Sequence, residues 1–241
     1  MARLAVLAGH TLLGMPFAAE AERVDVPTRY GTVAIRDTGD YVYLQRHGLD
    51  RYDAPHAIDH RANVLALAEA DCDRVLALGS VGSLRRDIGV GALVVPDDYI
   101  SLLVSASAFD DARGHVVPGF DVEWRARILR EFESAGEPLH DGGVYWQSAG
   151  PRFETRAEVR MIAPHADLVG MTIGSEAAVA GELGLAYAVV CNVDNFANGV
   201  APRALTLAEY EAGKASSRER VQRALGPVVR ALAGQSGAER G

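Results

Sequence analysis

The amino-acid sequence predicts a single α/β domain with a central mixed β-sheet flanked by helices. Short apolar runs typical of buried strands alternate with segments whose apolar residues recur at helical spacing, and this alternation is typical of α/β folds. Small and polar residues follow most of the apolar runs, where an α/β sheet would have its loops. No repeat or low-complexity linker divides the chain. We expect the domain to span residues 1–233 and a flexible tail to cover 234–241.

The predicted strands are short apolar runs bounded by turn residues. The first, Leu4–Ala8, is the one stretch that faintly resembles a secretory signal. Gly9, His10 and Thr11 interrupt it early, which favours a strand followed by a loop. Further strands are expected at residues 32–35, 41–45, 75–78, 92–95, 143–147, 168–169 and 186–191.

The predicted helices fill the longer intervals between these strands. Thr155 and Glu158 have the spacing of a capping box, which predicts that a helix begins there and runs to Ile162. The segment from Ser101 to Gly119 predicts a long loop, and long loops in compact domains are often functional. The other helices are expected at residues 57–70, 122–134, 175–183 and 205–232.

Composition and charge restrict the class of function. The chain has 241 residues and a net charge of −8, which argues against a nucleic-acid-binding protein because such proteins usually present a basic face. No stretch is long and apolar enough to span a bilayer, so no membrane partner is expected. Cys72 and Cys191 both lie in apolar runs, which predicts buried, reduced thiols and a cytoplasmic location.

The candidate site residues follow predicted strands. Ligands of open α/β sheets bind at the carboxyl ends of strands, so these segments are expected to line one shared cavity. Arg46 and His47 follow a strand and precede Gly48, and their donors suit an oxyanion. The segments concerned are residues 9–11, 46–48, 79–83, 170–172 and 194–199.

A metal site is not predicted. His56 and His60 are four residues apart and could share one face of a helix. No cysteine or third histidine is spaced to complete a ligand set, so polar contacts near a helix start are the favoured role.

Several motifs, in this order and spacing, make the chain resemble the trimeric purine nucleoside phosphorylase family over nearly its whole length. That family includes the methylthioadenosine and methylthioinosine phosphorylases. The motifs are Arg46-His47-Gly48, Arg61-Ala62-Asn63, Gly82-Ser83-Leu84, Gly150-Pro151-Arg152-Phe153-Glu154-Thr155, Gly170-Met171-Thr172 with Glu176, and Asn195-x-Ala197-x-Gly199.

The resemblance implies phosphorolysis, in which inorganic phosphate, the co-substrate, and a purine nucleoside give a free base and ribose 1-phosphate. It implies no metal or organic cofactor, and it implies a homotrimer or a dimer of trimers. The phosphate site implied by family position comprises Thr11, Arg46, His47, Thr172 and backbone around Ser80.

The resemblance also implies the nucleoside contacts. Met171 would pack on the ribose and Phe153 would stack near the base. Glu154 and Asn195 would read the base edge and, with His47, form the catalytic set. Two residues of the long loop, Phe109 and His115, would reach the 5′ end of the nucleoside in the neighbouring subunit.

Asn195 and Glu154 favour 6-oxopurine nucleosides such as inosine or guanosine. The amide of Asn195 can donate to a 6-oxo group and accept from a protonated N7. An ionised Glu154 is acceptor-only, so it suits the N1–H of hypoxanthine or guanine and repels the lone pair at adenine N1. The sequence does not indicate the 5′ substituent.

Departures from the family pattern leave alternatives open. His10 and Leu12 replace glycines of the first loop, where their bulk could crowd phosphate or His10 could add a donor. Asp194 adds a carboxylate beside Asn195 and is a candidate substrate contact, and Gly79 replaces a polar residue. Further departures are Asp59-His60 and Gly174-Ser175. The alternatives are a methylthioadenosine-type phosphorylase, a nucleoside hydrolase or biosynthetic variant, and a nucleoside-binding protein without activity.

Overall fold

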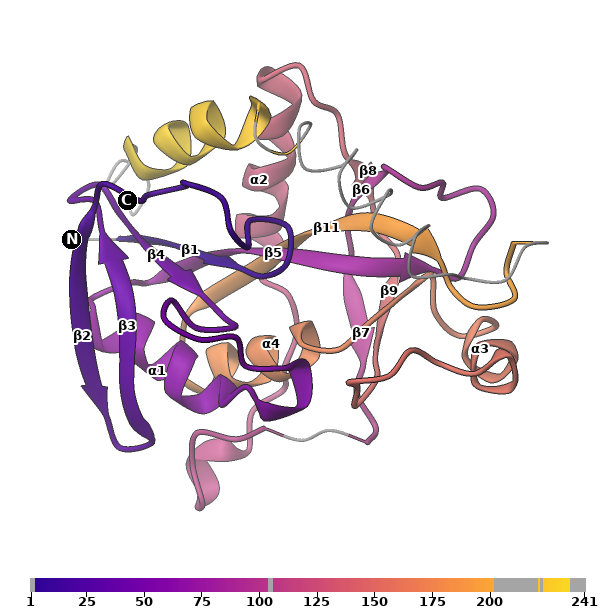
Figure 1. Ribbon diagram of the computed structural model, residues 1–241, viewed down its shortest axis with the longest axis horizontal. Coiled ribbons are helices and arrows are strands. Elements are labelled where there is room, and N and C mark those ends of the chain that lie inside the picture. The colour runs from indigo at the N-terminus through magenta and orange to yellow at the C-terminus, as the bar shows by residue number, and fades with distance from the viewer. Residues whose placement is uncertain (1–2, 104–105, 202–220, 222, 235–241) are drawn as a thin grey trace.

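The computed structural model describes residues 3–103, 106–201, 221 and 223–234. Within them, eleven strands form one mixed sheet flanked by helices (Figure 1), which confirms the predicted fold class. The strands are β1 (Leu4–Ala8), β2 (Glu22–Thr28), β3 (Gly31–Asp37), β4 (Tyr41–Gln45), β5 (Arg74–Ser83), β6 (Leu93–Val95), β7 (Asp98–Ile100), β8 (His140–Asp141), β9 (Val144–Gln147), β10 (Leu168–Gly170) and β11 (Ala186–Phe196). The helices are α1 (His60–Glu69), α2 (Val122–Ser134), α3 (Arg156–Ile162) and α4 (Ile173–Glu182), with 3-10 turns η1 (Pro55–Ala57) and η2 (Ala112–Gly114) and a C-terminal helix over 223–234.

The centre of the sheet is parallel. β1 pairs in parallel with β4 and β5, and β5 pairs in parallel with β11. Every residue of β1 is buried, as expected for a strand covered on both faces. The order is β2-β3-β4-β1-β5-β10-β9-β7, with β11 also on β5, β6 on β11 and β8 on β6.

Helices cover both faces of the sheet (Figure 1). Side chains alternate between the faces of a strand, so β1 contributes to two cores. Leu4 and Val6 pack in the core that contains Trp124 of α2 and the C-terminal helix. Ala5 and Leu7 pack in the core that contains residues of α1 and α4.

Capping residues set where two helices begin. The capping box of Thr155 and Glu158 is present at α3, as predicted. The helix predicted from residue 57 begins instead at His60, because Asp59 accepts hydrogen bonds from the first backbone N–H groups of α1. The preceding residues form η1.

Two strands extend further than predicted. The predicted strands 75–78 and 186–191 are parts of β5 and β11, which end at Ser83 and Phe196. Residues 79–83 and 194–196 are therefore strand and not loop, since the two strands pair with each other over their whole length. Because these stretches consist largely of small and polar residues, a hydrophobicity pattern does not predict that they are paired strands.

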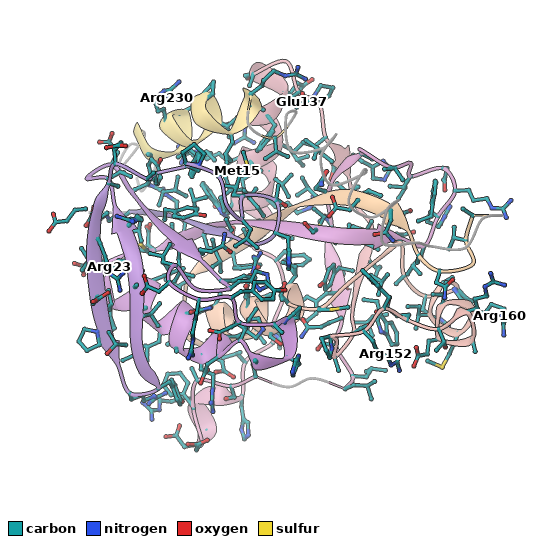
Figure 2. The ribbon with its side chains drawn as sticks, in the orientation of Figure 1. Met15, Arg23, Glu137, Arg152, Arg160 and Arg230 are labelled. Carbon is teal, nitrogen blue, oxygen red and sulfur yellow. The ribbon has the colours of Figure 1, made fainter. Side chains whose placement is uncertain are left out.

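β2 was not predicted, because it is a mostly exposed edge strand with charged residues. At the periphery of the molecule, Arg160 of α3 and Arg230 of the C-terminal helix extend toward solvent (Figure 2). β7 also escaped prediction, because it is only three residues long.

Cys72 and Cys191 are buried and unpaired, which confirms the expectation of buried thiols. None of the helices in the described part of the chain has the length and apolar character needed to cross a membrane. Residues 205–220 and 222 of the predicted last helix and residues 235–241 of the predicted tail lie outside the described residues.

Candidate active site

A cavity of about 360 Å³ opens where β1, β4, β5, β10 and β11 end or pass into loops. Its volume is in the range of small-molecule sites. The lining residues come from segments far apart in sequence, as predicted: His10, Arg46, His47, Tyr52, Ala54, Pro55, Ser80, Val81, Gly82, Pro151, Phe153, Glu154, Val169, Gly170, Met171, Thr172, Asn195 and Ala197.

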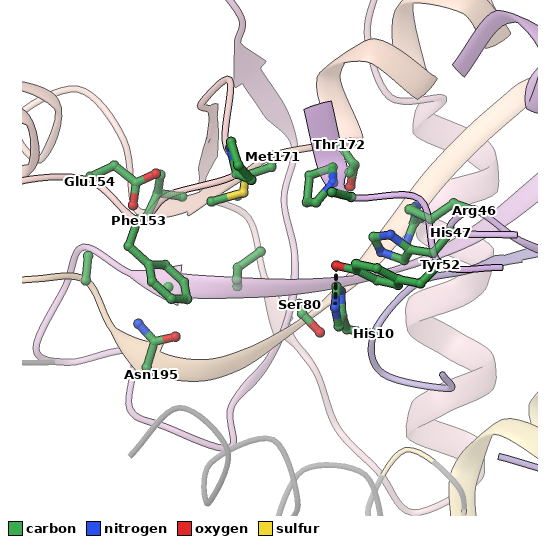
Figure 3. A pocket seen from close by; sticks show the side chains of 18 residues that line it. His10, Arg46, His47, Tyr52, Ser80, Phe153, Glu154, Met171, Thr172 and Asn195 are labelled. Atoms are coloured by element: carbon green, nitrogen blue, oxygen red, sulfur yellow. Dashed lines mark hydrogen bonds between the residues drawn. The ribbon is translucent and has the colours of Figure 1, made fainter. Parts of the chain in front are cut away.

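The cavity has two chemically different ends, with Met171 between them (Figure 3). One end contains the polar and cationic side chains His10, Arg46, His47, Tyr52, Ser80 and Thr172 (Figure 3). We call it the anion end. The other contains Phe153, Glu154 and Asn195, and we call it the base end.

Arg46 is held rigidly at the bottom of the anion end. Its Nε and Nη2 donate to the two carboxylate oxygens of Glu176 at 2.6 and 2.9 Å. Its Nη1 donates to the carbonyl of Leu78 at 2.7 Å, and Nη2 also reaches the carbonyl of Leu7 at 3.3 Å. An arginine has five N–H donors, so these four bonds leave one Nη1 proton for a ligand.

Glu176 remains ionised opposite Arg46. Burial alone would raise its pKa, but the charges of Arg46 and the proximity of His60 lower the pKa of Glu176 to about 2. The hydroxyl of Tyr187 donates to the same carboxylate at 2.7 Å. The motif that contains Glu176 was recognised in the sequence, but the role of Glu176 as the partner of Arg46 was not predicted.

Gly9 leaves the space that Arg46 occupies. A Cβ at Gly9 would lie 2.1 Å from Nη1 of Arg46, which cannot retreat because Leu78 and Glu176 hold it. We expect Gly9→Ala to lower the free energy of unfolding by about 1–3 kcal/mol, as overpacking does, and to weaken anion binding. Gly89→Ala is the control, since nothing lies within 4 Å of a Cβ there. Urea denaturation of both variants checks this, and equal stabilities would contradict it.

His47 faces the anion end as a neutral imidazole. Its Nδ1 lies 2.7 Å from the carbonyl of Asp53, which can only accept, so Nδ1 carries the proton. Burial lowers the pKa of His47 to about 4, with a smaller contribution from the charge of Arg46. Nε2 is therefore an acceptor at neutral pH.

The lowered pKa of His47 predicts a pH-dependent stability. Between about pH 6.5 and 4 the unfolded state binds a proton that the folded imidazole does not, so stability falls as the pH drops through this window, by up to about 3 kcal/mol. Denaturant unfolding from pH 8 to 4 measures it. In His47→Gln this part of the pH dependence should vanish. Identical profiles for the wild type and the variant would show that the lowered pKa of His47 does not cause it.

Hydroxyl groups complete the anion end. Thr172 precedes α4 but its side chain makes no capping bond. Tyr145 accepts from the N–H groups of Thr172 and Ile173, and Gln147 accepts from that of Ser175, so the threonine hydroxyl is a donor that remains for a ligand. Ser80 lines the cavity, whereas Thr11 is buried behind it, with its Oγ1 3.2 Å from Oγ of Ser80.

The base end contains an unsatisfied acceptor. Oε1 of Glu154 is buried and has no hydrogen-bond partner within the described residues. Leaving a buried carboxylate oxygen unpaired is costly, so its position in the cavity wall indicates a donor on a ligand. Nδ2 of Asn195 donates to the carbonyl of Phe196 at 2.8 Å, which leaves one N–H and the amide oxygen.

Asp194 does not line the cavity, contrary to its candidacy as a substrate contact. It lies at a β-bulge, where the register of β11 against β5 shifts between Val193 and Asn195. Such a bulge re-aims neighbouring side chains, so adjacent residues need not share a surface. The carboxylate of Asp194 accepts instead from Nδ2 of Asn192.

Phe109 and His115 lie away from the cavity of their own chain. Phe109 packs beneath Arg113, whose guanidinium carbon is 4.2 Å from the ring centroid. His115 is exposed at the end of η2. Leu12, suspected of crowding the site, is buried in the core and does not line the cavity.

Tyr52 is a polar cavity residue that sequence reasoning missed, together with Ala54 and Pro55 of the same segment. It belongs to a loop without periodicity, and its place beside His47 depends on how that loop folds back. His60, considered as half of a metal pair, lies 3.7 Å from Glu176. Among the residues that the structure describes, no three His, Cys, Asp or Glu side chains gather as metal ligands would.

Comparison with known proteins places these features in a family. The profile described as the phosphorylase superfamily matches residues 3–230. A protein of Archaeoglobus fulgidus named probable 6-oxopurine nucleoside phosphorylase is 39% identical over 224 residues, covering 90% of this chain and 91% of that protein. The 6-oxopurine nucleoside phosphorylase of Pyrococcus furiosus is 34% identical over 226 residues, covering 87% and 85%.

Two further matches differ in the substrate that they name. A probable S-methyl-5′-thioinosine phosphorylase of Methanothermobacter thermautotrophicus is 38% identical over 170 residues, 69% of this chain and 60% of that protein. The solved structure of Schistosoma mansoni methylthioadenosine phosphorylase with adenine has a TM-score of 0.83, with 22% identity, covering 98% of this chain and 93% of that one. The latter supports the fold alone.

Proposed function

Because the chain belongs to the phosphorylase superfamily, we propose that it is an enzyme that splits a 6-oxopurine nucleoside by phosphorolysis. The products are the free base and ribose 1-phosphate, or its 5′-modified form. The observation that carries the proposal is the presence, in one cavity, of an anion end and of a base end that contains both an unpaired Glu154 oxygen and Asn195. Relatives named as 6-oxopurine nucleoside phosphorylases support the same assignment.

At the anion end, phosphate is bound by donors on rigid elements. The remaining Nη1 proton of Arg46 and the hydroxyls of Ser80 and Thr172 donate to its oxygens. Thr11 supports Ser80 from behind. The neutral Nε2 of His47 accepts from a phosphate hydroxyl, so the bound species is hydrogenphosphate.

At the base end, Glu154 accepts from N1–H of the purine, and the free N–H of Asn195 donates to O6. The amide oxygen of Asn195 accepts from N7 once N7 is protonated. Phe153, at the base end, covers the base. Met171, which lies between the two ends (Figure 3), packs against the ribose.

In the reaction, the bond between N9 of the purine and C1′ breaks and its electron pair leaves with the base. Positive charge develops on the ribose, where the phosphate stabilises it before a phosphate oxygen bonds to C1′. Negative charge develops on the purine, where Asn195 donates to O6 and proton uptake at N7 neutralises it. The proton that hydrogenphosphate loses as it becomes ribose 1-phosphate balances this uptake. The site thus acts chiefly by preorganised electrostatics, and the proposal needs no metal or organic cofactor.

The assembly and location belong to the proposal as well. We expect a homotrimer or a dimer of trimers in the cytoplasm, in which Phe109 and His115 of one subunit reach the 5′ end of a neighbour's nucleoside. Support comes from apolar side chains exposed on the same segment, with Val117 99% and Leu103 79% exposed. Light scattering of the purified protein tests the assembly.

Base release tests the reaction and the substrate together. Purified protein is incubated with inosine, guanosine, adenosine and their 5′-methylthio analogues, with and without phosphate. We expect phosphate-dependent release of hypoxanthine or guanine, and the relative rates identify the 5′ substituent. Preferred release of adenine would refute the roles of Glu154 and Asn195, and equal release without phosphate would indicate a hydrolase. Tight purine binding without turnover would indicate a binding protein.

A further inference from the structure

The loop over residues 48–53 is fastened against His47. The backbone N–H of Asp53 donates to the carbonyl of His47 at 2.8 Å, and the ring Nδ1–H of His47 donates to the carbonyl of Asp53 at 2.7 Å. Earlier in the loop, the Arg23 guanidinium donates to both carboxylate oxygens of Asp50 at 2.7 and 2.8 Å. Together these bonds fix the loop so that the residue just before Asp53 lies against the imidazole ring of His47.

That residue is Tyr52, and its ring stacks on His47. The ring centroids are 5.0 Å apart and the planes are inclined by 18°. His10 completes the group, since its ring meets His47 edge-on at 4.4 Å and its Nε2 lies 3.1 Å from the Tyr52 hydroxyl (Figure 3). All three residues line the cavity at the anion end.

Core packing does not explain this arrangement. Tyr52 is 53% exposed, so its ring gains little from burial. The single Nδ1–H bond of His47 leaves the imidazole able to tilt about that bond, which would swing Nε2 away from the anion. A ring stacked on one face and a second ring at the edge prevent the tilt.

We propose that Tyr52 is a positioning residue for the phosphate contact of His47, and that His10 supports it by holding the Tyr52 hydroxyl and by its edge contact with the His47 ring. His10, which stands in place of a small residue of the first loop, thus forms part of the wall of the anion end. The inference rests on the proposed function, because it names residues that support the phosphate in that reaction.

Steady-state kinetics of Tyr52→Ala, Tyr52→Phe, His10→Ala and the double variant His10→Ala/Tyr52→Phe test the proposal. Tyr52→Ala removes the stack and should raise KM for phosphate about tenfold, with KM for inosine changed less than about twofold. Tyr52→Phe keeps the stack and loses only the bond to His10, so the rise should be about threefold. The double variant should match His10→Ala, because that change already removes the only contact that Tyr52→Phe breaks, the bond between the Tyr52 hydroxyl and His10.

A second readout is independent of turnover. Inorganic phosphate alone should stabilise the wild type against heat, and this stabilisation should shrink in the order Tyr52→Phe, then Tyr52→Ala. An unchanged KM for phosphate in Tyr52→Ala would overturn the proposal, as would equal rises of KM for both substrates. Additive effects in the double variant would show that His10 acts separately from Tyr52 and would overturn its assigned role. A wild type without phosphate-dependent turnover would instead refute the proposed function.

Discussion

Glu176→Ala is expected to lower the free energy of unfolding by about 3–5 kcal/mol, because it leaves the buried Arg46 guanidinium without its countercharge. The side chain of Arg46 is 2% exposed and that of Glu176 is fully buried, so water cannot replace the lost partner. The variant should also lose phosphate affinity, since the Arg46 donor would no longer be fixed. Denaturant unfolding and KM for phosphate measure the two effects.

Asp87→Ala is the matched control for this prediction. Asp87 pairs with Arg85 at 3.2 Å, but both side chains are at least half exposed, so removing the carboxylate should leave the stability nearly unchanged. If Glu176→Ala were as stable as Asp87→Ala, the buried pair would not hold Arg46 in place. The account of the anion end would then be wrong.

Asn195→Asp is expected to lower kcat/KM for inosine by about 10²–10³-fold, the usual loss when a donor to a developing negative charge is removed. A carboxylate at this position cannot donate to O6 and repels its lone pairs. Because it can accept from a 6-amino group, adenosine should lose much less activity than inosine. KM for phosphate should not change, since Asn195 lies at the other end of the cavity (Figure 3).

The ratio of the two nucleosides is the internal control for this variant. A general loss of structure would reduce turnover of inosine and adenosine alike and would also raise KM for phosphate. An unchanged rate with inosine would show that Asn195 does not read the 6-position. Comparable losses for both nucleosides with an unchanged KM for phosphate would show the same.

Much of the fold was predictable because its central strands are continuous apolar runs. β1 and β4 have the predicted bounds, and so does the capping box of α3. The extensions of β5 and β11 were not predictable, because glycine, serine and asparagine in those stretches resemble loop residues. Pairing between the two strands outweighs this local preference.

The site was predictable where a motif specifies both residue and position, as for Arg46 and His47, which do line the cavity. Asp194 could not be placed, because a β-bulge decides which side chains of β11 face the cavity and no residue pattern reveals the bulge. The role of Tyr52 depends on the path of a short loop, and that path is fixed by bonds of Asp53 to the backbone and ring of His47 and by the pair of Arg23 and Asp50. Such contacts follow from the three-dimensional arrangement and not from the local sequence.

The central claim is that the sugar is transferred from the base to phosphate. Phosphorus NMR of the purified protein with inosine and inorganic phosphate tests it most directly, because the technique observes the sugar product itself. We predict that the phosphate resonance declines as a ribose 1-phosphate resonance grows, in step with released hypoxanthine. Hypoxanthine released while the phosphate resonance stays constant would contradict the account, since it would show that water and not phosphate takes the ribose.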